Sequence, residues 1–326
     1  MKTEIIRILR EQKGEFVSGE MLCEQFSVSR NAVWKAINRL KEQGFEIESV
    51  TKKGYRLISE PDLLAKESIE SYLSREASVF CFDEIDSTNN ECMRLAGNGA
   101  PDGTLVAADC QTGGKGRRGR NWTTPKGTAV AMSILLRPQI APQNAPILTL
   151  VSALAVAKAL QENGVKEGLG IKWPNDLVLN KKKICGILTE MITEVDYINH
   201  IVVGIGINTH VESFPEEIKD IASSILLETG IKINRSKLIA DVYNCFFRYY
   251  DIFLKTEDLS GLKEEYDGLL LNKDKEVKVL DPKGEFCGTA LGINERGELK
   301  VKLSDGGVTE VSAGEVSVRG LYGYVL

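Results

Sequence analysis

The sequence lacks paired cysteines, clustered histidines and long apolar runs, and each absence excludes a class of protein. Seven cysteines are scattered singly without a C-x-x-C pair, and the two histidines lie apart from them, which argues against a disulfide framework or a cysteine–histidine metal site. The charged start, MKTEIIRILREQKGE, contains no signal-peptide core, and no uninterrupted run of about 20 apolar residues follows. We therefore expect a cytoplasmic protein with reduced thiols and no membrane partner.

What the chain does contain is an ordinary globular composition, with 43% hydrophobic and 27% charged residues. Its 326 residues are enough for two or three domains. The formal net charge of −5 argues against a protein that is covered throughout by nucleic acid. A basic surface can still lie within an acidic total, so charge has to be compared segment by segment.

The patterns in residues 1–60 predict three short helices followed by a hairpin. A first helix starts the chain, and Ser18 and Ser29 are good N-caps for the second and third helices. The third helix is expected to run from about residue 30 to 43 and to end at Gly44. The strands FEIESV and YRLI follow it, joined by a tight turn. This order is typical of a winged helix-turn-helix domain.

The expected third helix is rich in hydrogen-bond donors on its solvent face. Donors of this kind meet phosphates and base edges in a major groove, and two lysines at the hairpin tip can reach the adjacent DNA backbone. A solvated charged face on a small helical bundle is the alternative, but the caps, the short turn, the basic helix and the basic hairpin tip agree with one another. We expect DNA contacts from Ser29, Arg30, Asn31, Lys35, Arg39, Lys52 and Lys53.

A Glu-Pro-Asp break at residues 60–62 predicts a linker, after which a larger α/β region extends over residues 67–270. Seven strand candidates alternate there with helices at 88–98, 146–163 and 235–256. Hairpin-like spacing between several strands favours a mixed, mainly antiparallel sheet over a doubly wound one. Short strands and turns in residues 272–326 predict a small SH3-like β-barrel, or a sandwich, packed on the central domain. The predicted fold class is therefore α+β.

A glycine-rich cationic loop, QTGGKGRRGRNW at residues 111–122, is the most distinctive motif. Its G-x-G-x-x-G spacing suits a dinucleotide only when a helix follows, but the next residues, TTPKG, predict a turn. A glycine follows Lys115 where a Walker loop needs serine or threonine. Four cations within six positions repel one another unless an anion is bound, so we predict a loop that is loose when empty and ordered by a polyanion. A nucleic-acid patch is the alternative.

Four further motifs accompany this loop: DSTN at 86–89, KWPND at 172–176, KICGIL at 183–188 and GIGIN at 204–208. Together with the winged helix, these motifs resemble the biotin-protein ligase family, in particular the bifunctional bacterial biotin repressors and ligases, over essentially the whole chain. The resemblance implies an enzyme that joins biotin to ATP as biotinyl-5'-AMP and releases pyrophosphate. It then transfers biotin to a lysine of a carrier such as the biotin carboxyl carrier protein of acetyl-CoA carboxylase.

The resemblance also implies roles for the matching positions. The biotin-binding residues would be Ser87, Thr88, Asn89, Gln111, Lys115, Gly116, Arg117 and Lys183. The nucleotide-binding residues would be Arg117, Arg118, Arg120, Trp122, Lys172, Asn175 and Asn208. These types suit the ligands, because the ureido group of biotin is a neutral donor and acceptor whereas its carboxylate and the triphosphate are anionic. Lys115 stands where arginine is common in the family, which keeps the charge and removes the bidentate fork.

The implied reaction requires no nucleophile from the protein, because the biotin carboxylate itself attacks the α-phosphorus. Lys183, Arg117, Arg120 and Mg²⁺ would align the reactants and neutralise the developing charge. We expect Asp176 to orient the incoming lysine or to bind Mg²⁺, with a turn cap as the alternative, and we assign no other metal ligand. A turn at the end of a strand is the alternative for Asn208.

The resemblance also implies a repressor of the biotin operon that responds to biotin. The adenylate would order loops around the sheet, an exposed sheet edge would pair with a second copy, and the homodimer would present two winged helices to operator DNA. Carrier protein would compete for the same edge. Two other functions are a regulator that senses a small anion without catalysis and a lipoate-type ligase. A sensor needs no cation at a transferring carboxylate, so Lys183 argues against the sensor. A lipoate-type ligase typically lacks the DSTN and KWPND motifs together with a winged helix, so their presence argues against that ligase.

Overall fold

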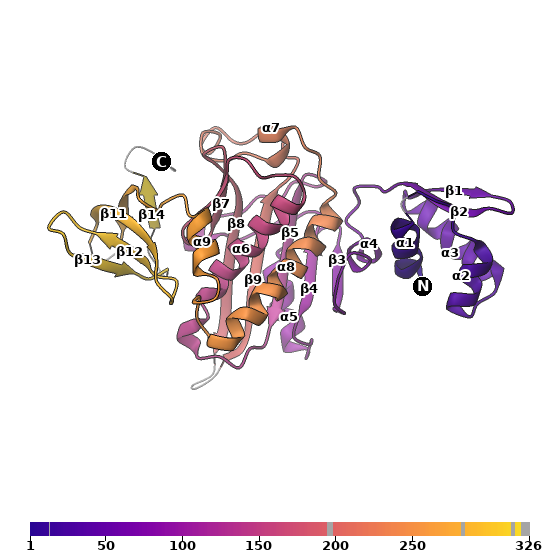
Figure 1. The fold of residues 1–326 in the computed structure, drawn as a ribbon, viewed down its shortest axis with the longest axis horizontal. Coiled ribbons are helices and arrows are strands. Elements are labelled where there is room, and N and C mark those ends of the chain that lie inside the picture. The colour runs from indigo at the N-terminus through magenta and orange to yellow at the C-terminus, as the bar shows by residue number, and fades with distance from the viewer. Residues whose placement is uncertain (13, 194–197, 282–283, 314–316, 321–326) are drawn as a thin grey trace.

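The structure is a computed structural model that describes the whole chain except residues 13, 194–197, 282–283, 314–316 and 321–326. Within the described residues, three groups of elements follow one another along the longest axis in Figure 1. Helices and a hairpin come first, a seven-stranded sheet with its helices lies in the middle, and a five-stranded sheet comes last. This mixture of helices and mainly antiparallel strands confirms the α+β class.

The first group folds as three helices and a hairpin around one core. Its elements are α1 (Lys2–Glu11), α2 (Gly19–Phe26), α3 (Arg30–Glu42), β1 (Glu46–Val50) and β2 (Gly54–Ser59). The hydroxyls of Ser18 and Ser29 accept hydrogen bonds from backbone N–H groups in the first turns of α2 and α3, so both predicted N-caps are confirmed. A backbone bridge between Val17 and Tyr55 attaches the hairpin to the helices, and apolar side chains from all five elements share the core.

The central sheet has the strand order β3-β4-β5-β9-β8-β7-β6. The strands are β3 (Val79–Phe82), β4 (Thr104–Ala108), β5 (Ala129–Leu136), β6 (Leu169–Lys172), β7 (Asp176–Leu179), β8 (Lys182–Thr193) and β9 (Ile198–Asn208). β3 and β4 pair in parallel and every other pair is antiparallel, which confirms the mainly antiparallel prediction. The two longest strands, β8 and β9, pair side by side and form the middle of the sheet.

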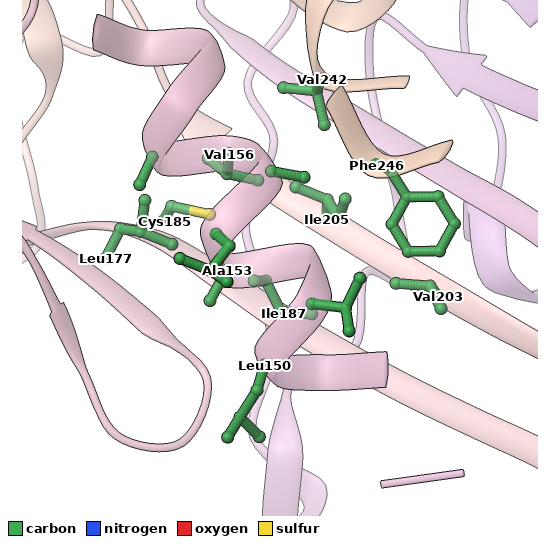
Figure 2. Close-up of a cluster of buried hydrophobic side chains, with 14 of the residues drawn as sticks. Leu150, Ala153, Val156, Leu177, Cys185, Ile187, Val203, Ile205, Val242 and Phe246 are labelled. Atoms are coloured by element: carbon green, nitrogen blue, oxygen red, sulfur yellow. The ribbon is translucent and has the colours of Figure 1, made fainter. Parts of the chain in front are cut away.

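Helices cover the two faces of this sheet. On one face lies α5 (Thr88–Gly97), which packs against β4, β5 and β9. On the other face lie α6 (Ile147–Glu162) and α8 (Arg235–Thr256), with the short α9 (Lys263–Leu269) against α6, and the short α7 (Ile225–Thr229) lies at one end of the sheet (Figure 1). Figure 2 shows Ala153 and Val156 of α6 beside Ile205 of β9, with Val242 and Phe246 of α8 on the same cluster. The main core therefore lies between β8–β9 and the pair α6–α8.

Helix α6 is apolar on all sides because it is buried on all sides. The segment Pro142–Glu162 is long and apolar enough to cross a membrane by length and composition, and within the described residues it is the one helix that meets this test. However, 72% of its most apolar window is buried inside the structure. Its composition is accounted for by contacts with α8 and the sheet.

The last group is an antiparallel sheet of order β13-β12-β11-β10-β14. Its strands are β10 (Glu276–Leu280), β11 (Phe286–Ile293), β12 (Leu299–Lys302), β13 (Val308–Val311) and β14 (Ser317–Gly320), of which β14 was not predicted. The Trp173 indole N–H donates to the Gly297 carbonyl at 3.0 Å, and apolar residues of this sheet are continuous with the central core. Packing on the central region is thus confirmed. Among the described residues no pairing joins β13 to β14, so closure into a barrel stays a prediction.

The linker carries a short helix, α4 (Lys66–Glu70), and holds the first group in place. The Arg10 guanidinium of α1 donates two hydrogen bonds to the Glu60 carboxylate, at 2.9 and 2.6 Å, and stacks 3.3 Å from the ring centroid of Tyr72. The Tyr72 hydroxyl also donates to Glu60. α1 is therefore docked on the linker by a partly buried cation.

A second, deeply buried arginine attaches the linker to the central sheet. Arg235 at the start of α8 is 2% exposed, and its guanidinium donates to the Asp62 side chain at 3.0 Å and to the Asp109 carboxylate at 2.5 Å. Asp109 follows β4, directly before the glycine-rich loop, and its carboxylate accepts the Gly127 N–H after that loop. A buried charge is stable only when it is paired and hydrogen-bonded. Arg235 therefore ties the linker to the base of the loop.

We expect Arg10→Ala to loosen the docking of α1 on α4. Loss of a charge-assisted contact of this kind costs about 1–2 kcal/mol, which corresponds to roughly tenfold faster amide hydrogen exchange in α4 if local opening governs exchange. Hydrogen-exchange mass spectrometry of the full chain measures the exchange rate of the α4 amides. Arg39→Ala, on exposed α3, is the control and should leave α4 unchanged. Equal exchange rates in α4 for Arg10→Ala and the unmodified chain would contradict the proposed docking.

Candidate functional site

One pocket lies where α5, the glycine-rich loop and strands β7, β8 and β9 meet. All five sequence motifs contribute to it, although they are far apart along the chain. Its lining consists of Ser87, Thr88, Asn89, Gln111, Lys115, Gly116, Arg117, Trp122, Asn175, Lys183, Gly186, Ile187, Leu188, Gly204, Ile205 and Gly206. Every residue that we predicted to bind biotin lines this pocket, so the structure brings that set together.

One end of the pocket is built from neutral hydrogen-bonding groups at the start of α5. The backbone N–H of Thr88 donates to Gln111 Oε1 at 2.9 Å. The Ser133 hydroxyl lies 2.8 Å from Thr88 Oγ1 and 2.6 Å from Asn89 Oδ1, and Asn89 Nδ2 donates to Glu190 Oε2 at 2.6 Å. Hydroxyl and amide groups held in this way can donate to or accept from an uncharged polar ligand. Ser133 and Glu190 were not predicted, because Ser133 lies in β5, which carries no recognisable motif, and Glu190 lies beyond the KICGIL motif of β8.

Glycines in the two central strands leave room for the pocket and for Trp122. A Cβ atom at Gly206 would lie 2.4 Å from the Trp122 ring, and one at Gly204 would lie 2.1 Å from Asn89 Oδ1. Glycine inside a strand is unfavourable unless another group approaches closely, which is the case here. The indole Nε1 of Trp122 is buried and has no hydrogen-bond partner among the described residues. This donor therefore lacks the partner that a buried N–H group normally has.

The glycine-rich loop is folded back on itself over these two central strands. The Gly116 N–H donates to the Arg120 carbonyl at 2.7 Å, and the Trp122 N–H donates to the Gly114 carbonyl at 2.9 Å. Arg118 has a φ of 60°, in the left-handed region, within a single turn of 3₁₀ helix that spans Arg117–Gly119. Strand β5 is the next regular element after the loop, and no α-helix begins in residues 120–128, all of which the structure describes, as expected for a loop that is not a dinucleotide-binding turn. Whether the loop loosens without a ligand stays a prediction.

Arg117 connects the loop to the central strands and to the last domain. Its guanidinium donates to Asn175 Oδ1 at 2.8 Å and to the Ala313 carbonyl at 2.6 Å. Asn175 in turn donates from Nδ2 to the Ile187 carbonyl at 3.1 Å. Burial lowers the pKa of the Arg117 guanidinium, and the nearby Asp176 carboxylate opposes this shift. The contact from Ala313 was missed, since no local signal marks a backbone carbonyl as a partner.

Lys183 and Asp176 face each other across the β7–β8 hairpin. Their side chains form an ion pair of 2.5 Å and are 24% and 12% exposed. Lys183 Nζ also lies 5.7 Å from the Trp122 ring centroid. A low-dielectric site strengthens such a pair, and an incoming carboxylate has to compete with Asp176 for the ammonium group. Asp176 is thus paired with Lys183 in this structure, and its role toward the incoming lysine or Mg²⁺ stays a prediction.

A second, cationic cavity adjoins the first and shares Arg117, Trp122 and Lys183 with it. Six of the seven residues that we predicted to bind nucleotide line this cavity: Arg117, Arg118, Arg120, Trp122, Lys172 and Asn175. Asn208 lines neither cavity. Its side chain instead donates to the Ser223 carbonyl at 3.0 Å and holds the segment that follows β9. The structure therefore separates Asn208 from the rest of the predicted set.

The predicted DNA-contacting residues lie together in the first domain. Ser29 caps α3, and Asn31, Lys35 and Arg39 are exposed along that helix. A groove between the start of α3 and the hairpin is lined by several residues that include Arg30, Lys52 and Lys53. In the part of the chain that the structure describes, no group of three or more His, Cys, Asp or Glu side chains is placed to hold a metal ion. The predicted Mg²⁺ therefore has no preformed protein cage here.

Three families match consecutive parts of the chain. The helix-turn-helix domain family matches residues 2–56, the biotin/lipoate A/B protein ligase family matches residues 80–208, and the biotin protein ligase C terminal domain matches residues 274–319. These matches cover the winged hairpin region, the pocket with its five motifs, and the last sheet respectively.

Relatives match the chain over nearly its whole length. The bifunctional ligase/repressor BirA of Bacillus subtilis is 38% identical over 94% of this chain and 95% of that protein. The protein of the same name from Escherichia coli is 32% identical over 94% of both chains. Among solved structures, the biotin protein ligase from Aquifex aeolicus in complex with biotin and ATP is similar, with a TM-score of 0.65 and 31% identity over 74% of this chain and 99% of that one.

We expect Gly206→Ala to distort the pocket, because the new Cβ would clash with the Trp122 ring. Overpacking of this kind costs about 1–3 kcal/mol of unfolding free energy, or displaces the indole and weakens ligand binding. Urea unfolding and calorimetric titration with biotin measure the two effects. Gly97→Ala is the matched control, since a Cβ there meets nothing within 4 Å, and it should leave biotin binding unchanged without lowering the unfolding free energy. Unaltered stability together with unaltered binding for Gly206→Ala would contradict the close approach of Trp122.

Proposed function

This chain belongs to the family of the bifunctional ligase/repressors, and from that premise we propose that it attaches biotin to a carrier protein at the expense of ATP and represses transcription in response to biotin. One observation carries the enzymatic part. A pocket with one end formed by hydroxyl and amide groups and an adjoining cationic cavity share Arg117, Trp122 and Lys183, so an uncharged polar group fits at one end and a polyanion at the other. Biotin bound together with ATP has this distribution of charge, and the product biotinyl-5'-AMP keeps one negative charge at its phosphate.

In this proposal biotin occupies the first pocket. The ureido group meets Ser87, Thr88, Asn89 and Gln111, whose hydroxyls and amides suit a neutral donor and acceptor. The carboxylate at the other end reaches Lys183 and exchanges with Asp176 as the partner of the ammonium group. Lys115 lies beside the ureido end, because its Nζ donates to Asn90 Oδ1 at 2.6 Å and lies 3.8 Å from Glu190 Oε1.

ATP occupies the adjoining cavity with its phosphates near the arginines of the loop. A biotin carboxylate oxygen attacks the α-phosphorus, and the bond to pyrophosphate breaks. Arg117, Arg120 and Lys183 neutralise the charge that develops on the phosphoryl oxygens. Mg²⁺, when bound, would supply further charge neutralisation to the phosphates. Asp176, the carboxylate beside Lys183, is the side chain that we propose would contact it.

In the second step the amine of the carrier lysine attacks the carbonyl carbon of the mixed anhydride and AMP leaves. We propose that Asp176 orients this amine and accepts its hydrogen bond. The loop and Trp122 cover the anhydride and keep water from it. The biotin carboxyl carrier protein of acetyl-CoA carboxylase is the acceptor that we propose.

The repressor part of the proposal relies on the winged helix-turn-helix domain and on a free strand edge. β7 pairs with β8 only as far as Gly186, so in the described structure Leu188–Thr193 of β8 have a strand neighbour on one side. Met191 and Ile192 on this edge are 41% and 47% exposed. We propose that two copies pair here when the adenylate is bound and that carrier protein competes for the edge.

The remaining parts of the proposal concern domain boundaries and location. We propose the domains 1–60, 67–270 and 272–326, with the last one an SH3-like barrel. We also propose a cytoplasmic location, which the lack of any disulfide among the seven cysteines supports.

Lys183→Ala should lower the rate of pyrophosphate release with biotin, ATP and Mg²⁺ by about 100-fold or more, the usual cost of removing one group that stabilises transition-state charge. A coupled assay of pyrophosphate measures the rate, and lipoate replaces biotin in a parallel assay. Lys166→Ala, an exposed lysine outside both cavities, should retain the full rate. Turnover with lipoate and none with biotin would overturn the proposed substrate, and a fully active Lys183→Ala would overturn the role of this lysine.

Ile192→Asp should abolish dimerisation while leaving pyrophosphate release intact, because a charge on a strand edge opposes pairing. Sedimentation velocity of the full chain with biotin, ATP and Mg²⁺ should show a dimer for the unmodified protein and a monomer for the variant. Ile218→Asp, at an exposed position outside β8, is the control and should still dimerise. A dimer of Ile192→Asp as strong as that of the unmodified chain would exclude this edge as the interface.

A further inference from the structure

We propose that Trp34 packs against the C5-methyl group of a thymine in the major groove and so contributes to operator specificity. The inference rests on the proposed repressor function. It adds Trp34 to the predicted DNA-contacting residues, which were chosen as hydrogen-bond donors and do not include it. Trp34 lies in the middle of α3 and is 54% exposed, whereas Trp173 in the central core is 1% exposed. An indole left in water on a short helix needs an explanation, because it is the largest apolar side chain.

The core of the first domain does not need this side chain. Four residues of α3 face inward and are buried: Val33, Ala36, Ile37 and Leu40. Trp34 lies on the opposite face, one turn after Arg30 and one turn before Asn38. Trp34 therefore lies on the outward face of α3, where the predicted contacts with DNA also lie.

The surroundings of Trp34 suit a nucleic acid better than a protein surface. Its neighbours on the outward face of α3 are Arg30, Asn31, Lys35 and Asn38, which are cations and hydrogen-bond donors. An apolar patch for protein docking would need apolar neighbours, and none of these four is apolar. Arg30 pairs with Glu20 at 3.5 Å, but both side chains are largely exposed, so this ion pair is weak and Arg30 is free to exchange to a phosphate or a base.

The chemistry of the major groove then identifies the group that an indole can contact. Arginine, lysine and asparagine read the polar base edges, whereas the C5-methyl of thymine is the apolar feature that a base pair presents there. Trp34 is surrounded by arginine, lysine and asparagine side chains. The helix therefore carries hydrogen-bond donors for the polar base edges and one large apolar surface for a methyl group. The indole N–H can additionally donate to a neighbouring base acceptor.

The test removes the methyl group and nothing else. The probe is the duplex that the full-length chain enriches from a random-sequence pool in the presence of biotin, ATP and Mg²⁺. Each thymine of that duplex is replaced in turn by uracil, which keeps the hydrogen-bonding edge and lacks the methyl. For the unmodified chain, we expect uracil at one or two positions of each half-site to weaken binding by about fourfold, the factor that corresponds to one buried methyl group.

Trp34→Ala should bind the enriched duplex more weakly and should no longer distinguish uracil from thymine at those positions. Trp34→Phe should retain part of the discrimination, which a general loss of folding would not produce. Lys35→Ala is the matched control from the same helix face. It should weaken binding to all duplexes and keep the full sensitivity to uracil, because it acts on phosphate or polar edges. Thermal unfolding of each variant checks that the domain is folded.

Three results would overturn the inference. The unmodified chain could tolerate uracil at every position, or Trp34→Ala could remain as sensitive to uracil as the unmodified chain. Alternatively, Trp34→Ala could bind DNA normally and associate less strongly with itself, in which case the indole serves a protein contact. If no sequence is enriched from the pool at all, the repressor function fails together with the inference, whereas specific enrichment without a methyl effect removes the role of Trp34 alone.

Discussion

The antiparallel pairing of β8 with β9 is the constraint on which the rest of the molecule depends. Its register places Gly186 opposite Gly206 and Ile187 opposite Ile205. The glycines line the pocket on one face of the sheet, while Ile205 is buried against α6 and α8 on the other. Because side chains alternate along a strand, a shift of one residue would turn isoleucines into the pocket and glycines into the core. Register, core and ligand site are therefore determined together.

The charged side chains of the site surround strands β8 and β9. They are paired with one another or would be paired with a bound ligand. Lys183 pairs with Asp176 across the β7–β8 hairpin, and the Arg117 guanidinium is held by Asn175 and by a carbonyl from the last domain. Burial makes these interactions stronger than they would be in water, and it makes an uncompensated cation costly. The concentration of cations in the loop is consistent with a polyanionic ligand that completes the pairing.

Contacts of the loop extend beyond the central sheet in two directions. Through Arg117 it reaches the segment before β14, and through Asp109 and Arg235 its base is joined to the linker at Asp62. The linker in turn holds α1 through Glu60 and Arg10. A ligand that orders the loop thus acts on residues that are connected, by ion pairs and hydrogen bonds, to the domain with the winged hairpin. Such a chain of contacts supplies a physical route for a response to biotin.

The sequence by itself determined what depends on neighbouring residues. The caps at Ser18 and Ser29, the strands with alternating or continuous apolar residues, and the glycines within strands all follow from local periodicity and backbone preference, and the five motifs indicated the ligands. Only the tertiary structure decided which distant groups meet. Ser133 and Glu190 complete the polar end of the pocket, the Ala313 carbonyl contacts Arg117 across 196 positions of the chain, and Asn208 turns away from both cavities. These contacts depend on how sheets and helices pack, and a local pattern carries no information about a partner that the fold brings from far along the chain.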